Sequence, residues 1–488
     1  MFSTELKGPK YCQPDILVYT RRIMTSQLQA KTGCLDRLAL HGSLRDPILD
    51  SINFLNEVMD RFPQAISFAP GAPYAGFFEG TDIAAHIERY CDYLATERKF
   101  SPEKIRKHLY QYGPSRGQIN DLIAQALFTD EGIEVTGESI VVTVGCQEAI
   151  LLVLRALCAS KNDVVAVVNP CFAGIAGAAR LLDVEILPVE ETEQGFDWAK
   201  LTFDCQLLRQ SGKRVTAMYV APDFSNPSGT VLSLNARHEL LAFAKHENFV
   251  VLEDNAYGFT ASSDTKLPTL KALDNGRQVI YFGTCAKTCM PGVRVGFVVA
   301  DQLVVDGNIS LGILAHQLAS LKSMVTVNTS PICQAIVGGM LLENGCSISA
   351  LSAPKASFYR SNLSYLLAAL DLHMRVGSEP INYISWNQPQ GGFFVRMKLP
   401  VIVDLALLDY CANKYGVLWT PMSFFMVGEH KSYEIRLSCS YLDPNQIDEG
   451  VRRLARFVRD ERVRGVAPEH VPTQQEIPPN AKQSVSHR

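Results

Sequence analysis

The sequence predicts an α/β protein in which a large domain with a mostly parallel sheet is joined to a smaller α+β domain. Two patterns carry this prediction. Between residues 139 and 299, short runs of β-branched residues, apolar on both faces, alternate with longer helical patterns. Strands buried on both faces are typical of a parallel sheet covered by helices. From about Ser357 a long amphipathic helix precedes strands that we expect to be antiparallel, a mixture typical of an α+β unit.

The elements of the large domain follow one another in a regular order. The expected strands are 139–144, 163–169, 184–189, 215–220, 249–254, 278–283 and 294–299. The expected helices between them include 146–160, 174–182 and 234–248. In the smaller domain we expect a helix over 357–373 and strands within 382–399 and 432–441. Ligands of such open sheets bind at the carboxyl ends of the strands.

The domain boundaries are expected where these patterns change. Residues 1–45 carry few long apolar patterns and are expected to form an N-terminal arm. We assign 79–345 to the large domain and combine 46–78 with 346–463 in the small domain. Residues 464–488 are rich in proline and polar residues, which predicts a disordered tail.

The composition excludes several classes of protein. The 488 residues are 47% apolar and 20% charged with a net charge of −4, so no attraction to nucleic acid or anionic membrane is expected. No apolar run reaches the roughly 18 residues of a membrane span, and the N-terminus does not resemble a secretory signal. The 13 cysteines lack paired spacing, which is typical of reduced thiols in a cytoplasmic protein and predicts no metal site.

A set of residues, most of them polar or charged, lies at or just after the ends of the expected strands, where a ligand site could form. They are Gly145, Cys146, Gln147, Phe172, Asn226, Asp254, Tyr257, Thr284, Lys287 and Arg294. Their chemical types suit a phosphorylated pyridine aldehyde. A carboxylate such as Asp254 can keep a pyridine nitrogen protonated, and the amine of Lys287 can bind the aldehyde. Phe172 can stack on the ring, while Asn226 and Tyr257 can donate hydrogen bonds to its phenolic oxygen.

The phosphate of such a cofactor needs donors of another kind. Backbone amides at a helix N-terminus bind phosphate, and Gly145, Cys146 and Gln147 open the expected helix after the first strand. Thr284 can add a hydroxyl group, and Arg294 can add a forked guanidinium. The sequence therefore contains a donor for each end of the same cofactor.

Six motifs, in order along residues 51–456, give the chain a family resemblance. They are "QYGPSRG", "SNPSG", "EDNAYG", "AKTCMPGVRVG", "PQGGFF" and "YEIRLS". Together they resemble the class I/II aminotransferases of the pyridoxal-phosphate fold-type I superfamily. The chain is most similar to the aromatic and aminoadipate branch, and "FLNEVMDRFPQAISFAPGAP" resembles the dihydroxyphenylglycine-type aminotransferases of natural-product pathways.

The resemblance implies an activity and roles for individual residues. The implied enzyme uses pyridoxal 5′-phosphate to transfer the amino group of an α-amino acid to a 2-oxo acid. Asp254, Tyr257 and Lys287 would be catalytic, with Lys287 holding the cofactor and moving the proton. Arg436 would clamp the substrate carboxylate, with Gly71, Tyr74 and Asn226 also at the substrate. Tyr112 would reach the phosphate of the neighbouring subunit, which implies a homodimer with shared active sites.

The substrate and the reaction type leave alternatives open. Tyr74, Phe77 and Phe78 offer an aromatic pocket wall or plain core without a second cation, which favours a large apolar or aromatic donor unless Arg21 or Arg22 folds over the site. The same cofactor also serves lyases and synthases that perform β/γ-replacement or C–C bond formation on substrates such as S-adenosylmethionine, and amino-acid oxidases. A ligand-sensing regulator is a third possibility, but the chain shows no recognition-helix pattern ahead of the fold.

Overall fold

The computed structural model describes residues 35–192, 195–376, 381–428, 431–460 and 463, and it divides into two compact units, Met1–Arg45 and Asp46–Arg488. The described part of the first unit contains two 3₁₀ helices, η1 (Arg37–Ala39) and η2 (Gly42–Arg45). Most of the expected N-terminal arm, including Arg21 and Arg22, and the expected tail 464–488 lie outside the described residues. The second unit holds all the other elements.

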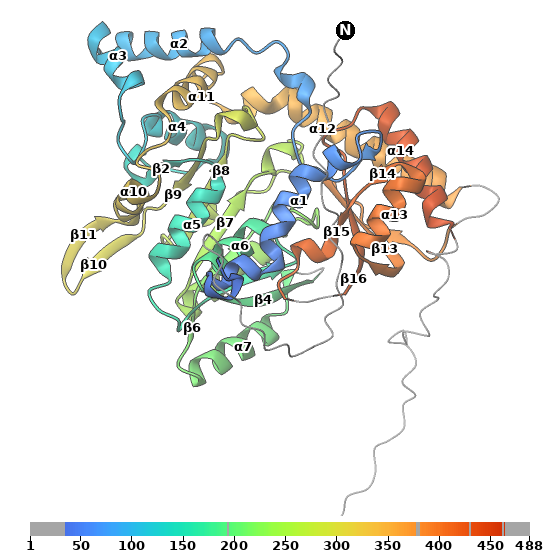
Figure 1. Ribbon diagram of the computed structural model, residues 1–488. Helices are drawn as coiled ribbons and strands as arrows, with labels where there is room; N and C mark the ends of the chain where they lie inside the picture. Colours follow the sequence, from blue (N-terminus) through green and yellow to red (C-terminus); the bar gives the residue numbers. More distant parts are fainter. Residues whose placement is uncertain (1–34, 193–194, 377–380, 429–430, 461–462, 464–488) are drawn as a thin grey trace, which may run out of the picture. The chain divides into compact units, whose positions relative to one another are not determined.

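An eight-stranded sheet forms the centre of the second unit, in the order β2-β9-β8-β7-β6-β3-β4-β5 (Figure 1). Its strands are β2 (Ile140–Thr143), β3 (Asp163–Asn169), β4 (Glu185–Thr192), β5 (Gly195–Phe196), β6 (Arg214–Val220), β7 (Val250–Asn255), β8 (Val279–Thr284) and β9 (Gly296–Val299). The neighbours from β4 to β8 are parallel, whereas β9 is antiparallel to β8 and β2, and β5 to β4. The mostly parallel sheet is confirmed.

Helices cover both faces of this sheet. They are α2 (Ile83–Thr96), α3 (Pro102–Tyr110), α4 (Asn120–Glu131), α5 (Cys146–Leu157), α6 (Ala173–Leu181), α7 (Trp198–Gln210), α8 (Leu234–Glu247), α9 (Leu270–Leu273), α10 (Leu314–Val325) and α11 (Pro331–Glu343). One core cluster joins α5, α6 and α10 to the sheet, and two further clusters join α4 with α11 and α7 with α8. Successive strand residues such as Val141 and Val142 belong to different clusters, because side chains alternate between the two faces.

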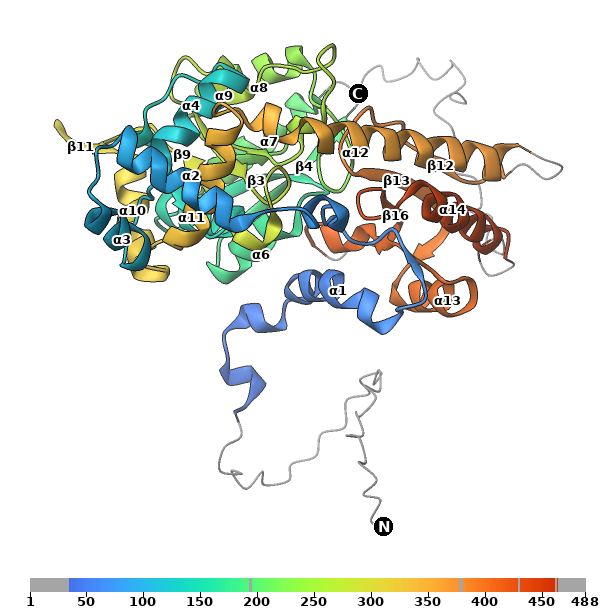
Figure 2. The same ribbon diagram turned by 90° about the horizontal axis from the view of Figure 1, so that it is seen from above.

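A second core lies around an antiparallel sheet of four strands. Its order is β12 (Ser385–Trp386), β13 (Phe394–Val403), β16 (Ser432–Ser438) and β15 (Thr420–Pro421). The helices there are α1 (Pro47–Arg61), α12 (Ile348–Leu370), α13 (Leu405–Tyr415) and α14 (Pro444–Val458), beside a parallel pair of β1 (Ile66–Ser67) and β14 (Val417–Leu418). Figure 2 shows α12 extending to α14. Val58 and Phe68 belong to this core, and the division into 79–345 and 46–78 with 346–463 stays a prediction.

One hairpin was not expected from the sequence. β10 (Leu303–Asp306) pairs with β11 (Ile309–Ile313), and Leu303, Val305 and Ile309 are exposed.

No single described helix is long and apolar enough to cross a membrane; one bent pair, Pro331–Glu343 with Ile348–Arg375, passes that test by length and composition only.

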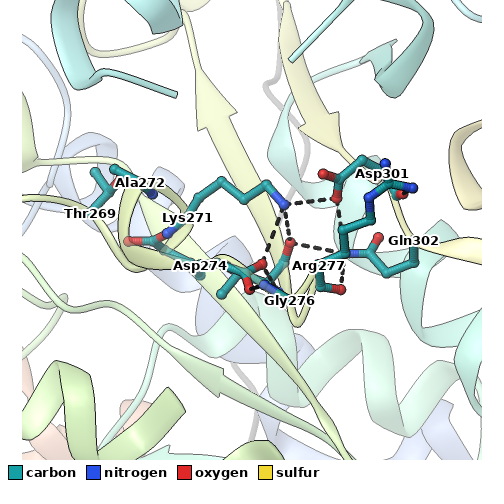
Figure 3. A network of polar contacts seen from close by, with 10 residues as sticks. Thr269, Lys271, Ala272, Asp274, Gly276, Arg277, Asp301 and Gln302 are labelled. Carbon is teal, nitrogen blue, oxygen red and sulfur yellow. Dashed lines mark hydrogen bonds and ion pairs between the residues drawn. The ribbon is translucent and has the colours of Figure 1, made fainter. Parts of the chain in front are cut away.

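A buried polar network fixes one end of the large sheet (Figure 3). The Nζ of Lys271 on α9 donates to Asp301 Oδ1 at 2.7 Å and to the Val279 carbonyl at 3.1 Å. It also lies 3.4 Å from Asp274 Oδ2, whose carboxylate accepts the Val279 N–H at 2.8 Å. Lys271 is therefore a buried cation whose charge is matched by neighbouring carboxylates.

Candidate functional site

A cavity of about 440 Å³ lies at the carboxyl ends of the parallel strands. The structure brings most of the predicted site residues together around it. Those lining the cavity are Gly71, Cys146, Gln147, Phe172, Asn226, Asp254, Tyr257, Thr284, Lys287, Arg294 and Arg436. Most of them follow from chain direction, because β2, β3, β6, β7 and β8 point the same way and their succeeding loops meet at one edge. Gly71, which follows β1, and Arg436, on β16, come from other parts of the chain.

Lys287 lies in the turn that follows β8. Its Nζ donates a 2.7 Å hydrogen bond to the carbonyl of Gly71, a residue 216 positions earlier in the chain. Burial lowers the pKa of Lys287 to about 8, and the nearby cations Arg436 and Arg294 add to the effect. A substantial fraction of the amine is therefore neutral near physiological pH, as a nucleophile or a base requires.

Asp254 lies on β7 with its carboxylate buried at the cavity wall. The hydroxyl of Tyr219, on the neighbouring β6, donates to Asp254 Oδ2 at 2.5 Å. Burial raises the pKa of Asp254 to about 6, and the Tyr219 hydrogen bond opposes that rise. A cationic group in the cavity would offset the burial. Sequence reasoning missed Tyr219, although its place near the end of an expected strand was a usable signal.

Arg436 lies on β16 and reaches the opposite side of the cavity. Its guanidinium donates to Asn226 Oδ1 at 2.7 Å and to the Ala69 carbonyl at 2.6 Å, both neutral acceptors. The rings of Phe394 and Phe425 lie 4.3 and 4.5 Å from its central carbon. Burial lowers the pKa of Arg436 to about 9, and its Nε has no hydrogen-bond partner among the described residues.

No carboxylate of the described chain lies within 4 Å of the Arg436 guanidinium. A fully buried cation without a counter-charge is unfavourable unless a ligand supplies one. The arrangement thus calls for an anion beside Arg436. The sequence did not indicate Phe425 or Phe394 as neighbours of Arg436, because they come from separate segments. Phe394 begins β13, and Phe425 ends the 3₁₀ helix Met422–Phe425.

The N-terminus of α5 forms another anion-binding corner. Its N-cap, Gly145, has a φ of 76°, and no side chain caps this helix end. A Cβ on Gly145 would lie 2.6 Å from Arg294 Nη2, so the absence of a side chain lets the guanidinium approach the helix amides. The Cys146 thiol donates to the Gly283 carbonyl at 3.1 Å, and burial raises its pKa well above the usual value.

The remaining lining residues have defined neighbours. Phe172 is the N-cap of α6, and the Gln147 side chain donates to the Gly174 carbonyl at 2.9 Å in the same helix. Tyr257 packs edge-on against Phe394, and burial raises the pKa of its hydroxyl. Tyr257 is therefore a neutral hydroxyl that can donate to a ligand.

Three predicted site residues, Gly145, Tyr74 and Tyr112, are not among the residues that line the cavity. Gly145 precedes the lining residues Cys146 and Gln147 as the N-cap of α5. Tyr74 stacks on Phe358, with ring centroids 4.9 Å apart, in an aromatic cluster that also contains Phe77. Phe78 lies under the Lys355 ammonium at 5.5 Å. Tyr112 is 85% exposed in the single chain. Its role toward a neighbouring subunit and the role of Tyr74 at the substrate stay predictions.

The charges in the cavity fit the predicted cofactor and substrate. Of the described residues, Lys287, Arg294 and Arg436 line it together with one carboxylate, that of Asp254. The excess of positive charge suits a phosphate at the Arg294 corner and a carboxylate at Arg436. The residues present therefore fit pyridoxal phosphate with an amino acid beside it.

Comparison with known proteins gives consistent similarities. A model of the family "Aminotransferase class I and II" matches residues 95–454. The chain is 46% identical over 445 residues to the (S)-3,5-dihydroxyphenylglycine transaminase of Amycolatopsis orientalis, covering 91% of this chain and 98% of the relative. It is 28% identical to aromatic-amino-acid aminotransferase 1 of Thermococcus litoralis, covering 74% and 84%.

A solved structure is similar over most of the fold. The α-aminoadipate aminotransferase of Thermus thermophilus, complexed with N-(5′-phosphopyridoxyl)-L-leucine, has a TM-score of 0.69 at 26% identity. The similarity covers 86% of this chain and 97% of that one.

Proposed function

The chain belongs to the family of class I and II aminotransferases, and from this premise we propose roles for its residues, a donor class and an assembly. It is a pyridoxal-phosphate-dependent enzyme that transfers the amino group of an α-amino acid to a 2-oxo acid. The relatives quoted above are transaminases, so the replacement, synthase and oxidase alternatives are not favoured. A cytoplasmic location stays a proposal, supported by free thiols that are buried or half-buried.

The ring of the cofactor would lie between Phe172 and the strand ends. Asp254 would hold the ring nitrogen, where the positive charge of the protonated ring would offset the burial that raises the pKa of this carboxyl. Asn226 and Tyr257 would donate to the phenolic oxygen. When bound, pyridoxal phosphate supplies an electron sink for the bond that breaks at the substrate Cα.

The phosphate would lie at the N-terminus of α5. The backbone amides of Gly145, Cys146 and Gln147 would donate to it, aided by the helix dipole. Thr284 and Arg294 would complete its contacts from the other side. This end of the site would anchor the cofactor and would take no part in the proton transfer.

Lys287 would hold the cofactor between turnovers and move the proton during them. Its amine lies against the Gly71 carbonyl, a neutral acceptor that orients Nζ without stabilising its charge as a carboxylate would. Because the pKa of Lys287 is about 8, part of the free amine is neutral. The neutral amine can accept the proton from the substrate Cα and later donate it to another atom.

The observation that carries the proposal is the buried Arg436 without a carboxylate partner in the described chain. The α-carboxylate common to amino acids and 2-oxo acids would bind there in bidentate fashion. Asn226, which already accepts from Arg436 Nη1, would connect this clamp to the cofactor ring.

For the amino donor we propose a large apolar or aromatic side chain. Among the described residues that line the cavity, the cations are Lys287, Arg294 and Arg436, and each of these three already has a role. The lining does include Phe425 and Tyr219. A second carboxylate buried there without a partner would be unfavourable. The relative that acts on dihydroxyphenylglycine, an amino acid with an aryl group, supports the same class.

For the assembly we propose a homodimer with shared active sites. Exposed apolar side chains occur on the end of α3 and the loop after it, and on the end of α10, the loop after it and the start of α11: Tyr110, Tyr112, Met324, Val325, Val327 and Ile332. These segments are tied together, because the Val142 N–H donates to the Arg116 carbonyl at 2.8 Å and the Val142 carbonyl accepts from Thr329 Oγ1 at 3.0 Å. Exposed apolar patches of this kind mark protein interfaces.

Spectroscopy of the purified protein tests the reaction. We expect a visible band from bound cofactor, and we expect borohydride reduction followed by peptide mapping to find the adduct on Lys287. An aromatic amino acid alone should convert the band to that of the pyridoxamine form, and a 2-oxo acid should restore it. An adduct on another lysine would refute the assignment of Lys287, and a lasting new product without the pyridoxamine form would favour the alternative reactions.

A further inference from the structure

A buried charge cluster adjoins the first turn of α5. Glu148, in that turn, is buried, and its Oε2 accepts a 2.7 Å hydrogen bond from Lys322 Nζ on α10. Its Oε1 accepts from Thr326 Oγ1 at 2.5 Å, and Lys322 also donates to Thr326 at 2.7 Å. Lys322 is 0% exposed, and Glu148 is its one ion-pair partner among the described residues. Burial lowers the pKa of Lys322, and Glu148 opposes the change.

Glu148 fixes the backbone just before the N-cap of α5, although no side chain caps the helix amides themselves. Helix N-caps usually supply a side-chain acceptor, but Gly145 has none. Glu148, three residues later, reaches back and accepts the Val144 N–H at 2.6 Å. This contact resembles the backward half of a capping box, shifted by one residue. It fixes the backbone immediately before Gly145, while the following amides remain free of any side-chain cap.

The same carboxylate creates an electrostatic difficulty for an anion site. A negative charge in the first turn interacts favourably with the helix dipole, but it repels a phosphate that binds to the amides of that turn. Lys322 removes this conflict, because it lies against Glu148 and cancels its charge inside the protein. The pair can therefore hold the turn rigidly without adding net negative charge beside the phosphate.

We propose that Glu148 and Lys322 are positioning residues for the cofactor phosphate, in which Glu148 anchors the turn of Val144 and Gly145 and Lys322 neutralises the anchor. The inference rests on the proposed function, which places the phosphate at the N-terminus of α5. Neither residue lines the cavity, so both act through the backbone and the local charge.

Four variants separate anchoring from charge. The single variants Lys322→Met and Glu148→Gln each leave one buried charge unpaired. The double variant Glu148→Gln/Lys322→Met removes both charges and keeps an acceptor for the Val144 N–H. The double variant Glu148→Ala/Lys322→Met removes both charges and the acceptor. For each full-length protein the measurements are the dissociation constant of pyridoxal phosphate, by absorbance titration, and the midpoint of urea unfolding without cofactor.

We expect both single variants to lose stability, because each has a buried unpaired charge. Cofactor affinity should fall at least about tenfold in Lys322→Met, where the remaining charge repels phosphate, and clearly less in Glu148→Gln. Glu148→Gln/Lys322→Met should bind nearly as the wild type does, and Glu148→Ala/Lys322→Met should bind more weakly than it. The control Lys271→Met removes another buried lysine, leaves its carboxylate partners without a cation, and should lose stability with no comparable loss of affinity.

The competing outcome is a purely structural pair. Equal affinity losses in Lys322→Met and Glu148→Gln, or losses that follow stability alone across the set including Lys271→Met, would overturn the proposal. If Lys322→Met does not fold, equal affinities of the two double variants would overturn the anchoring role by themselves. A wild-type protein that binds no pyridoxal phosphate would refute the proposed function instead, and the two failures are therefore distinct.

Discussion

Two buried lysines, 16 positions apart in the chain, have opposite surroundings. Lys271 donates to Asp301 and to a backbone carbonyl and lies near Asp274, so its charge is matched inside the protein (Figure 3). Among the described residues, the Lys287 amine has one hydrogen-bond partner, the neutral Gly71 carbonyl. Burial lowers the pKa of Lys287 to about 8. A buried cation with its own carboxylates cannot be removed without leaving those carboxylates unpaired, whereas one without them is available for a ligand or for proton transfer.

The buried arginines repeat the contrast. Arg237, fully buried, donates to both oxygens of Asp223 and to nearby backbone carbonyls. Arg436 donates to neutral acceptors, and its Nε has no partner in the described chain. The difference suggests a general criterion: among buried cations, the unmatched ones mark the site.

Substituting the two lysines gives the largest expected effect. Lys287→Ala should lower kcat by about 10⁴-fold or more, since both cofactor attachment and the proton-transfer base are lost. The cooperative unfolding transition should persist. Lys271→Ala should retain near-normal kcat per folded molecule. The measurement is steady-state kinetics with active-site concentration from bound cofactor, and appreciable turnover by Lys287→Ala would break the comparison.

Substitution of Lys271, whose charge is matched by carboxylates, should lower the free energy of unfolding more than substitution of Lys287. Lys271→Met removes one partner of a buried cluster and leaves Asp274 and Asp301 without their cation, which costs about 3–5 kcal/mol in the free energy of unfolding. Urea unfolding of the wild type and the variant measures it. Lys287→Met serves as the control and should be as stable as the wild type or more so. A smaller loss from Lys271→Met than from Lys287→Met would reverse the assignment.

The parts of the site that were predictable follow directly from a strand or a motif. Asp254, Thr284 and Lys287 come at or just after the ends of their own strands, so local pattern was enough to place them. The contacts that make Arg436 a clamp were not predictable, because they join segments far apart in the chain. Its bond to Ala69 spans 367 residues, and Phe425 comes from a separate 3₁₀ helix.

The fold shows the same division. The parallel strands were predicted from short β-branched runs, whereas the β10–β11 hairpin was missed. Its register shifts between Leu303 and Val305, and its outer residues are apolar yet exposed, so alternation of polar and apolar positions is absent there. Pattern reasoning depends on burial, and it fails where an apolar strand is not buried within the chain.

Substitution of Arg436, the buried arginine without a carboxylate partner in the described chain, should weaken substrate binding. Arg436→Ala should raise KM for the amino donor by about thirty-fold to several thousand-fold, because truncating one partner of a desolvated charge pair costs about 2–5 kcal/mol. The matched Arg237→Ala should change stability and leave KM nearly unaltered. Initial-rate kinetics over donor concentration distinguish them. An unchanged KM in Arg436→Ala would mean that another group binds the carboxylate.

The lowered pKa of Lys287 predicts a pH dependence of stability. Between about 8, the folded-state value, and 10.5, the ordinary value, the unfolded chain binds one more proton at this residue than the folded chain. The free energy of unfolding of cofactor-free protein should therefore rise with pH through this window, by up to about 3 kcal/mol from Lys287. Urea unfolding at both ends of the window measures it, and Lys287→Met should lack this contribution. Parallel pH profiles of the two proteins would contradict the lowered pKa.

The smallest expected effect concerns the donor side chain. The cations of the cavity are assigned to the cofactor and to the α-carboxylate, so a second carboxylate on the donor would lack a partner, while an aromatic ring could pack against lining residues such as Phe425. Burying such a ring contributes about 1.5–3 kcal/mol, or a factor of about 10 to 150. We therefore expect phenylalanine and tyrosine to exceed aspartate and glutamate in kcat/KM by at least the lower factor. Leucine and methionine serve as apolar controls without a ring. If aspartate or glutamate were the better donor, a cation outside the described cavity lining would have to reach the substrate, and the criterion of unmatched buried cations would be incomplete.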